Sequence, residues 1–127
     1  MEIKPVYPAG MQKTKAHYSP GIVHNGLVYV SGQLPLDTNG EALLGTIEEQ
    51  TILCMKNIES ILKTAGSGLD QILKTNVFIN DIGNWAKFNE TYAGIMGEHR
   101  PARIVVPCGP LNRGCAIEID CIAAVKS

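Results

Sequence analysis

An Asn-Gly pair between two apolar, β-branched runs constrains the fold of this 127-residue chain more than any other feature. Residues 22–24 and 27–31 read as strands, and Asn25-Gly26 supplies the two positive-φ positions that a type I′ turn requires. We therefore expect an antiparallel hairpin here. A further turn is expected at residues 37–40, where Asp, Asn and Gly gather.

Two amphipathic helices are expected in the middle of the chain. Thr46, with Glu49 three residues later, has the spacing of a capping box, and an apolar stripe of helical period follows over residues 47–65. Gly66 is placed to end this helix in the left-handed conformation. A second stripe between residues 85 and 96 is more typical of a core than of a stacking platform, and it comprises Trp85, Phe88, Tyr92 and Ile95 or Met96.

Residues 74–79, 101–107 and 116–123 are further strand candidates. The order hairpin, helix, strand, helix, strand, strand indicates an α+β fold, with one mixed sheet and two helices on one face. Two helices cover only that face, yet residues 27–30 are apolar on both sides of their strand. We expect the second face to be buried against sister subunits, with ligand sites at subunit boundaries.

Composition narrows the classes of function. A chain of 127 residues fits a single domain over residues 1–127, and its net charge of −1 provides no global attraction for nucleic acid or anionic lipid. No long apolar run suggests a signal peptide or a membrane span, so a cytoplasmic protein is expected. The four cysteines form no CxxC pair and the three histidines are scattered, which predicts reduced thiols and no metal site.

Two late strands carry the candidate chemistry. Pro101 disfavours helix at the residue before it, so Arg103 is expected at the mouth of a β-branched strand, where a guanidinium can face a cleft. Alternation along residues 116–123 puts Glu118 and Asp120 on one face. If the two strands pair, one cation and one carboxylate share a site. The same residues also fit an ordinary surface arginine and the solvated face of an antiparallel sheet.

Short motifs follow one another in order between residues 18 and 124, namely Tyr18-Ser19, Val30-Ser31-Gly32-Gln33-Leu34-Pro35, Asn89 with Tyr92, Pro101-Ala102-Arg103, and Ile117-Glu118-Ile119. As an ordered set they resemble the RidA/YjgF family of reactive-intermediate deaminases. The resemblance implies a chorismate-mutase-like (bacillus-type) fold, assembled as a homotrimer with clefts between neighbouring subunits. It also implies hydrolysis of 2-imino acids or their enamine tautomers, such as 2-iminobutanoate and 2-iminopropanoate, to 2-oxo acids and ammonia, without metal or cofactor.

The same resemblance assigns roles to single residues. Arg103 matches the arginine that holds the substrate carboxylate, a task that suits a bidentate and permanently charged guanidinium. Glu118 matches the carboxylate that holds the attacking water and carries protons. The substrate-binding set, which orients the ligand and shapes the cleft, is completed by Tyr18, Ser31, Gly32 and Asn89. The expected ligands are a small 2-imino acid or 2-oxo acid, and the expected macromolecular partner is a further copy of the chain.

Four residues depart from the family pattern. Ile104-Val105 stands where Ser-Cys or Ser-Thr is common, His17 where Pro is usual, and Pro20 where Gln is frequent. Because contacts after the arginine are partly through backbone, Ile104-Val105 is compatible with the site but bears on its substrate range.

Other functions also fit parts of the sequence. A non-catalytic binder or sensor of small 2-oxo or other carboxylic acids at the subunit interface would use the same Arg103. A ribonuclease, an activity attributed to some relatives, would be expected to show a basic stripe, which the sequence lacks. A hydrolase using Glu118 and Asp120 as paired carboxylates, about 7 Å apart, would need a sugar-stacking surface that is not evident.

Overall fold

The computed structural model describes residues 2–11 and 16–126, and its described part is built on one six-stranded mixed sheet. The strand order is β1-β2-β3-β6-β4-β5, and only β4 and β5 run parallel. The strands are β1 (Lys4–Val6), β2 (Gly21–His24), β3 (Leu27–Gln33), β4 (Ile72–Ile79), β5 (Ala102–Pro107) and β6 (Ile117–Ala124). All strands except the short β1 were expected from the sequence.

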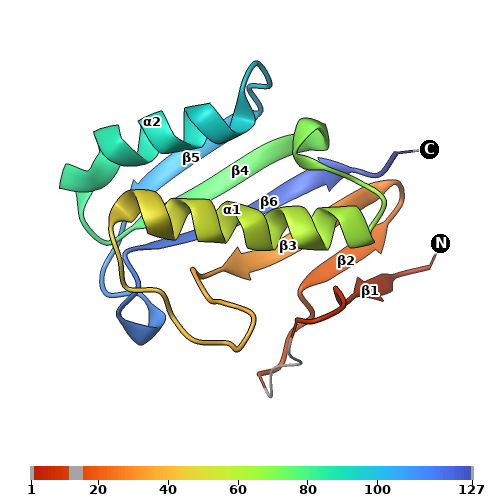
Figure 1. Cartoon of the computed structure of the whole chain (residues 1–127). Helices are drawn as coiled ribbons and strands as arrows, with labels where there is room; N and C mark the ends of the chain where they lie inside the picture. Colours follow the sequence, from red (N-terminus) through yellow and green to blue (C-terminus); the bar gives the residue numbers. More distant parts are fainter. Residues whose placement is uncertain (1, 12–15, 127) are drawn as a thin grey trace.

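Both helices lie on the same face of this sheet, as predicted (Figure 1). They are α1 (Ile47–Thr64) and α2 (Trp85–Met96), and short 3₁₀ turns are η1 (Leu69–Gln71), η2 (Ile82–Asn84) and η3 (Asn112–Gly114). The capping box of α1 is confirmed, because the Glu49 amide donates to Thr46 Oγ1 at 3.1 Å and the Thr46 amide donates to Glu49 Oε1 at 2.9 Å. Gly66 has a φ of +82°, so the helix ends where it was expected to end.

The core lies between the helices and the sheet, and β6 illustrates how alternation builds it. Its residues alternate between buried and half-buried, and the buried set consists of Ile117, Ile119, Cys121 and Ala123. Each fully buried isoleucine of this kind contributes about 1.5–3 kcal/mol from removal of apolar surface from water. Because successive side chains of a strand point to opposite faces, Glu118 and Asp120 must lie on the face that carries no helix.

The hairpin that was predicted from Asn25-Gly26 is present, with φ values of 58° and 78° at its two turn residues. Its second strand, β3, continues to Gln33 and changes register against β6 between Val30 and Gln33. A bulge of this kind bends a strand and redirects its side chains. It lies at Ser31 and Gly32, two of the predicted site residues.

The helix-free face of the sheet is not uniformly polar. Phe78, Val106 and Ile122 are half-buried there, while the Tyr29 and Ile104 side chains on the same face are 42% and 50% exposed. An apolar face with no helix over it agrees with the expectation that further copies of the chain cover it, which stays a prediction.

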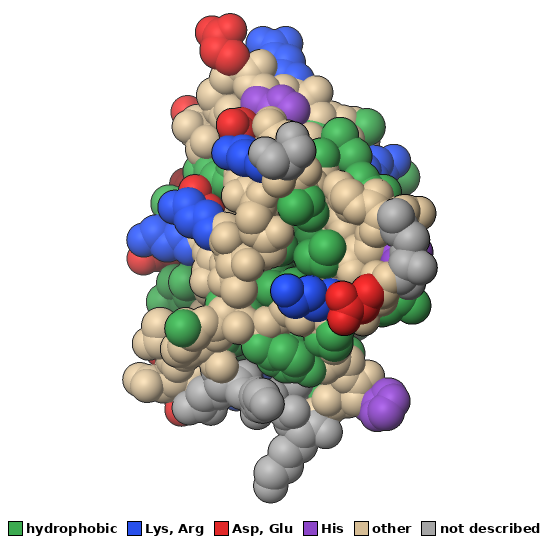
Figure 2. All heavy atoms as spheres, turned by 90° about the vertical axis from the view of Figure 1, so that its right-hand side faces the viewer, with side chains coloured by type: hydrophobic (Ala, Val, Ile, Leu, Met, Phe, Trp, Pro, Cys, Tyr) green, Lys and Arg blue, Asp and Glu red, His purple; other side chains and the backbone are tan. Residues whose placement is uncertain are grey.

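The surface mixes charges of both signs. Figure 2 shows the end of the molecule at which β1 begins and β6 ends, and acidic and basic side chains are interspersed on it. Neither helix in the described part of the chain is long and apolar enough to cross a bilayer.

Candidate active site

Arg103 is held beneath α2 on the helix-covered face of the sheet. It pairs with Thr75 of β4, and its Nη1 donates to Asn89 Oδ1 at 2.9 Å. The guanidinium carbon lies 5.1–5.9 Å from the centroids of three aromatic rings at helical spacing on α2, those of Trp85, Phe88 and Tyr92. The side chain is therefore fixed in orientation before any ligand arrives.

The Arg103 guanidinium has further N–H donors that a ligand can use. Asn89 accepts from one nitrogen of Arg103, and no carboxylate in the described part of the chain lies within ion-pair distance of it. A half-buried cation with rings around it and no anionic partner is suited to an external carboxylate, which a guanidinium can hold through parallel hydrogen bonds.

The aromatic residues of α2 only partly follow the expectation of a core stripe. Phe88 and Tyr92 are buried, but the Trp85 side chain is 39% exposed and stands at the surface beside Arg103. Helical spacing identified the face on which these rings lie, and it could not show that a cation occupies that face. The prediction that Trp85 belongs to the core is wrong.

Glu118 lies on the opposite, helix-free face of β6, close to the bulge in β3. A Cβ atom at Gly32 would approach Glu118 Oε2 to 2.7 Å. Any larger residue at position 32 would push the carboxylate aside, so the glycine is what lets Glu118 lie this close to the backbone of β3. Gly32 and Glu118 are thus brought together as predicted.

The surroundings of Glu118 increase its affinity for a proton. Burial raises the pKa of Glu118 above its ordinary value, and the charge of Asp120 on the same face raises it further. A carboxyl whose pKa is moved toward neutrality transfers protons more effectively at neutral pH. Asp120 in turn accepts a hydrogen bond from Asn76 Nδ2 at 2.7 Å.

Asn76 was missed by the sequence analysis. The alternation of β4 places it on the helix-free face, and the register sets it directly opposite Asp120. The alternation was visible in the sequence. The pairing of β4 with β6, which decides the neighbour, was not.

Two hydrogen bonds of Ser31 connect the segment before β2 to the bulge in β3. Its hydroxyl donates to the Ser19 carbonyl at 2.6 Å, and its amide donates to the Pro20 carbonyl at 2.9 Å. Tyr18, which is 50% exposed, precedes this attachment directly. We refer to Tyr18, Ser31, Gly32 and Glu118 as the β3–β6 group.

The second set of predicted residues, Asn89 and Arg103, is the α2–β5 group. The two groups do not meet within one copy, because β4 lies between β5 and β6. Arg103 pairs with Thr75, and Thr75 pairs in turn with Cys121 of β6. Because Cys121 is an odd number of residues from Glu118, the Arg103 and Glu118 side chains point to opposite faces of the sheet. Sheet spacings place their Cα atoms about 14 Å apart. The condition set for a shared site, pairing of these two strands, is not met.

The residues that depart from the family pattern lie in different environments. Ile104 points to the helix-free face, opposite to Arg103, and is 50% exposed, whereas Val105 is half-buried against the core. His17 is exposed and Pro20 is buried. None of these side chains displaces Arg103 from its contacts with α2.

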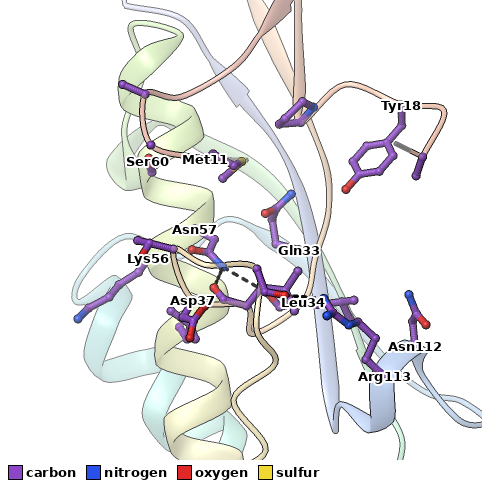
Figure 3. A pocket seen from close by; sticks show the side chains of 18 residues that line it. Met11, Tyr18, Gln33, Leu34, Asp37, Lys56, Asn57, Ser60, Asn112 and Arg113 are labelled. Atoms are coloured by element: carbon purple, nitrogen blue, oxygen red, sulfur yellow. Dashed lines mark hydrogen bonds between the residues drawn. The ribbon is translucent and has the colours of Figure 1, made fainter. Parts of the chain in front are cut away.

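A cavity of about 610 Å³ lies on the helix side of the sheet, between α1 and the loop after β3 (Figure 3). Tyr18 and Gln33 line it, but Arg103, Asn89 and Glu118 do not. Asn57 of α1 fixes the adjoining loop by donating to the Leu34 and Leu36 carbonyls at 3.2 and 2.9 Å. This cavity is therefore distinct from the α2–β5 group.

Three buried cysteines are inert as nucleophiles at neutral pH. Burial raises the pKa of Cys54, Cys115 and Cys121, the last to about 12, so these thiols keep their protons. Cys54 and Cys121 are core residues. Within the described residues, no three His, Cys, Asp or Glu side chains are placed to share a metal ion.

Comparison with known proteins identifies the family. The family model described as Endoribonuclease L-PSP matches residues 10–125. The chain belongs to the RidA/YjgF family. It is 38% identical over 112 residues to the Saccharomyces cerevisiae protein MMF1, named mitochondrial, a match covering 88% of this chain and 77% of that protein.

Solved structures of RidA/YjgF relatives share the fold. The Yersinia pestis Rid-family protein YyfA, described as of unknown function, is 34% identical with a TM-score of 0.93, covering 98% of this chain and 100% of that one. Escherichia coli TdcF, solved with bound serine, is 28% identical with a TM-score of 0.89, covering 97% and 99%. The resemblance and the α+β architecture are thus confirmed, while the residue roles stay predictions.

Proposed function

We propose that this RidA/YjgF protein is a 2-imino acid deaminase, which hydrolyses 2-iminopropanoate, 2-iminobutanoate or their enamine tautomers to 2-oxo acids and ammonia. The observation that carries the proposal is Arg103, a guanidinium held by Asn89 and three aromatic rings with no carboxylate partner in the described residues. All these substrates bear a carboxylate beside the reacting carbon. TdcF supports the proposal because the serine bound to it also carries a carboxylate.

The proposed reaction needs one water and one proton carrier. Arg103 binds the substrate carboxylate, and Glu118 holds a water near the imine carbon. As the water oxygen bonds to this carbon, the C=N π electrons move to nitrogen and Glu118 takes a proton from the water. Glu118 then returns this proton to nitrogen, which gives a carbinolamine with a hydroxyl and an amino group on the same carbon. In the second transfer Glu118 takes the hydroxyl proton and passes it to the amino nitrogen, the C–N bond breaks, and ammonia leaves as the C=O bond forms. Imines hydrolyse unaided, so positioning and proton transfer suffice without metal or cofactor.

We further propose that the site is completed between copies in a homotrimer. Arg103 and Glu118 lie on opposite faces of one sheet with β4 between them, so one copy cannot present both to a small substrate. Arg103 lies on the edge strand β5, where a neighbouring copy can approach. In the proposed assembly the α2–β5 group of one copy faces the β3–β6 group of the next.

The first experiment is an imine-decay assay with the wild-type protein. An amino-acid oxidase generates 2-iminopropanoate or 2-iminobutanoate from alanine or 2-aminobutanoate, and the disappearance of the imine is followed with and without the protein. We expect clear acceleration above an equal concentration of albumin. Decay at the buffer rate with both imines would overturn the deaminase proposal.

The second candidate is a non-catalytic binder or sensor of small 2-oxo or other carboxylic acids at the same interface. Serine bound to TdcF favours it, because a ligand in a related structure is not evidence of turnover. Calorimetric titration with 2-oxobutanoate separates the two functions. Saturable binding together with imine decay at the buffer rate would support the binder.

Complementation between variants tests the shared site. Neither Arg103→Ala nor Glu118→Gln should hydrolyse imines alone, but an equimolar mixture of the two after subunit exchange should recover about a quarter of wild-type activity, since that fraction of all interfaces carries both intact groups. As the control, each variant is carried through the same subunit-exchange procedure by itself and should stay inactive. If native mass spectrometry finds mixed trimers that remain inactive, the two groups do not form one site.

Two other expectations stay predictions. The family description names an endoribonuclease, but the net charge of −1 and the mixed charges in Figure 2 favour a small ligand over nucleic acid. Residence in the cytoplasm is a prediction as well, because MMF1 is named mitochondrial.

A further inference from the structure

A second carboxylate lies beside Glu118 in a fixed position. Glu118 and Asp120 are two residues apart on the helix-free face of β6, and both are half-buried. Asn76 stands directly opposite Asp120 on β4 and donates from Nδ2 to Asp120 Oδ1 at 2.7 Å. Glu118 is paired with Phe78, which provides no such donor. The two carboxyls thus have different neighbours although they share a face.

A carboxylate held in this place acts on the proton affinity of Glu118. The hydrogen bond from Asn76 fixes the side chain of Asp120 on the face that it shares with Glu118. Two like charges on a half-buried surface disfavour each other. Burial and, after it, the charge of Asp120 raise the pKa of Glu118 above its ordinary value.

Few other charges act on this pair. The titratable or charged side chains that face Glu118 or lie behind it are Tyr29 of β3, Lys74 of β4, Cys54 of α1 and Cys115 before β6. Lys74 is the one cation among these side chains, and it lies opposite Ile122, further along the sheet than Asp120. β5 brings only uncharged side chains to this face, those of Ala102, Ile104 and Val106. In the proposed trimer, the neighbour's Arg103 would act on wild type and Asp120 variants alike.

We propose that Asp120, fixed by Asn76, is a positioning carboxylate: it makes Glu118 the group that takes the water proton and hands it to the departing nitrogen. This inference rests on the proposed deaminase function. The sequence motifs assigned no role in that reaction to Asp120 or to Asn76. Asp120 need not touch the substrate, because it acts through the proton affinity of Glu118.

The test has a readout that does not depend on turnover. The ¹³C shift of the Glu118 side-chain carboxyl is followed against pH by NMR, with Glu118→Gln used to assign the signal. We expect the midpoint of this titration to move to lower pH in Asp120→Asn, and to move less in the same direction in Asn76→Ala. Glu98→Gln, an exposed change away from this face, should leave it unmoved.

The same proteins are then assayed for imine hydrolysis across pH. The acid limb of kcat/KM should move to lower pH in Asp120→Asn, in step with the NMR midpoint. An unchanged Glu118 midpoint in Asp120→Asn, or an unmoved acid limb in an active enzyme, would overturn the inference. If the midpoint moves but even the wild type fails to accelerate hydrolysis, the control of Glu118 by Asp120 stands and the deaminase proposal fails.

Discussion

Replacement of Arg103 by alanine is expected to abolish imine hydrolysis while the fold persists. The substrate carboxylate would lose its bidentate cationic partner in a half-buried site, and losses of this kind cost roughly 2–5 kcal/mol. We expect kcat/KM for 2-iminobutanoate to fall by about 100-fold or more. The measurement is the imine-decay assay on wild type and variant side by side, with circular dichroism to verify that both are folded.

Two further variants make the Arg103 result specific. Arg100→Ala removes an equally charged but exposed side chain three residues earlier, and it should retain wild-type activity. Arg103→Lys keeps the charge but loses the planar fork, so it should fall between wild type and alanine. Near-normal turnover in folded Arg103→Ala would show that the substrate carboxylate is bound elsewhere.

Glu118→Gln is expected to separate binding from chemistry. The amide has nearly the same shape as the carboxylate but cannot take a proton from water, and loss of a general base typically lowers the rate by about 10²–10⁴-fold. Binding of 2-oxobutanoate should survive, because Arg103 is intact. Calorimetry and the imine-decay assay on the same preparation measure the two properties. If binding is lost together with turnover, Glu118 has a structural role instead.

The pH dependence of stability provides an internal control for this variant. The pKa of Glu118 is raised in the folded protein, so this group's contribution to stability is complete below its ordinary value of 4.5 and is lost as pH rises through the folded value. At pH 7 the ionised side chain therefore costs stability. Glu118→Gln should melt at pH 7 no lower than wild type, and its advantage should shrink toward pH 4. A lower melting temperature at pH 7 would contradict this account.

The sequence determined the features that depend on neighbouring residues. The I′ turn at Asn25-Gly26 and the capping box of α1 follow from contacts within a few positions, so they could be predicted without knowledge of the fold. The ordered motifs likewise identified the RidA/YjgF family and singled out Arg103 and Glu118.

Only the tertiary structure decided which of these residues are neighbours. Alternation assigns a side chain to a face of its strand, but it reads the same whichever strand lies alongside, because pairing partners are chosen by contacts distant in sequence. Insertion of β4 between β5 and β6 therefore could not be foreseen, and it separates Arg103 from Glu118 within one copy. The same insertion sets Asn76 against Asp120.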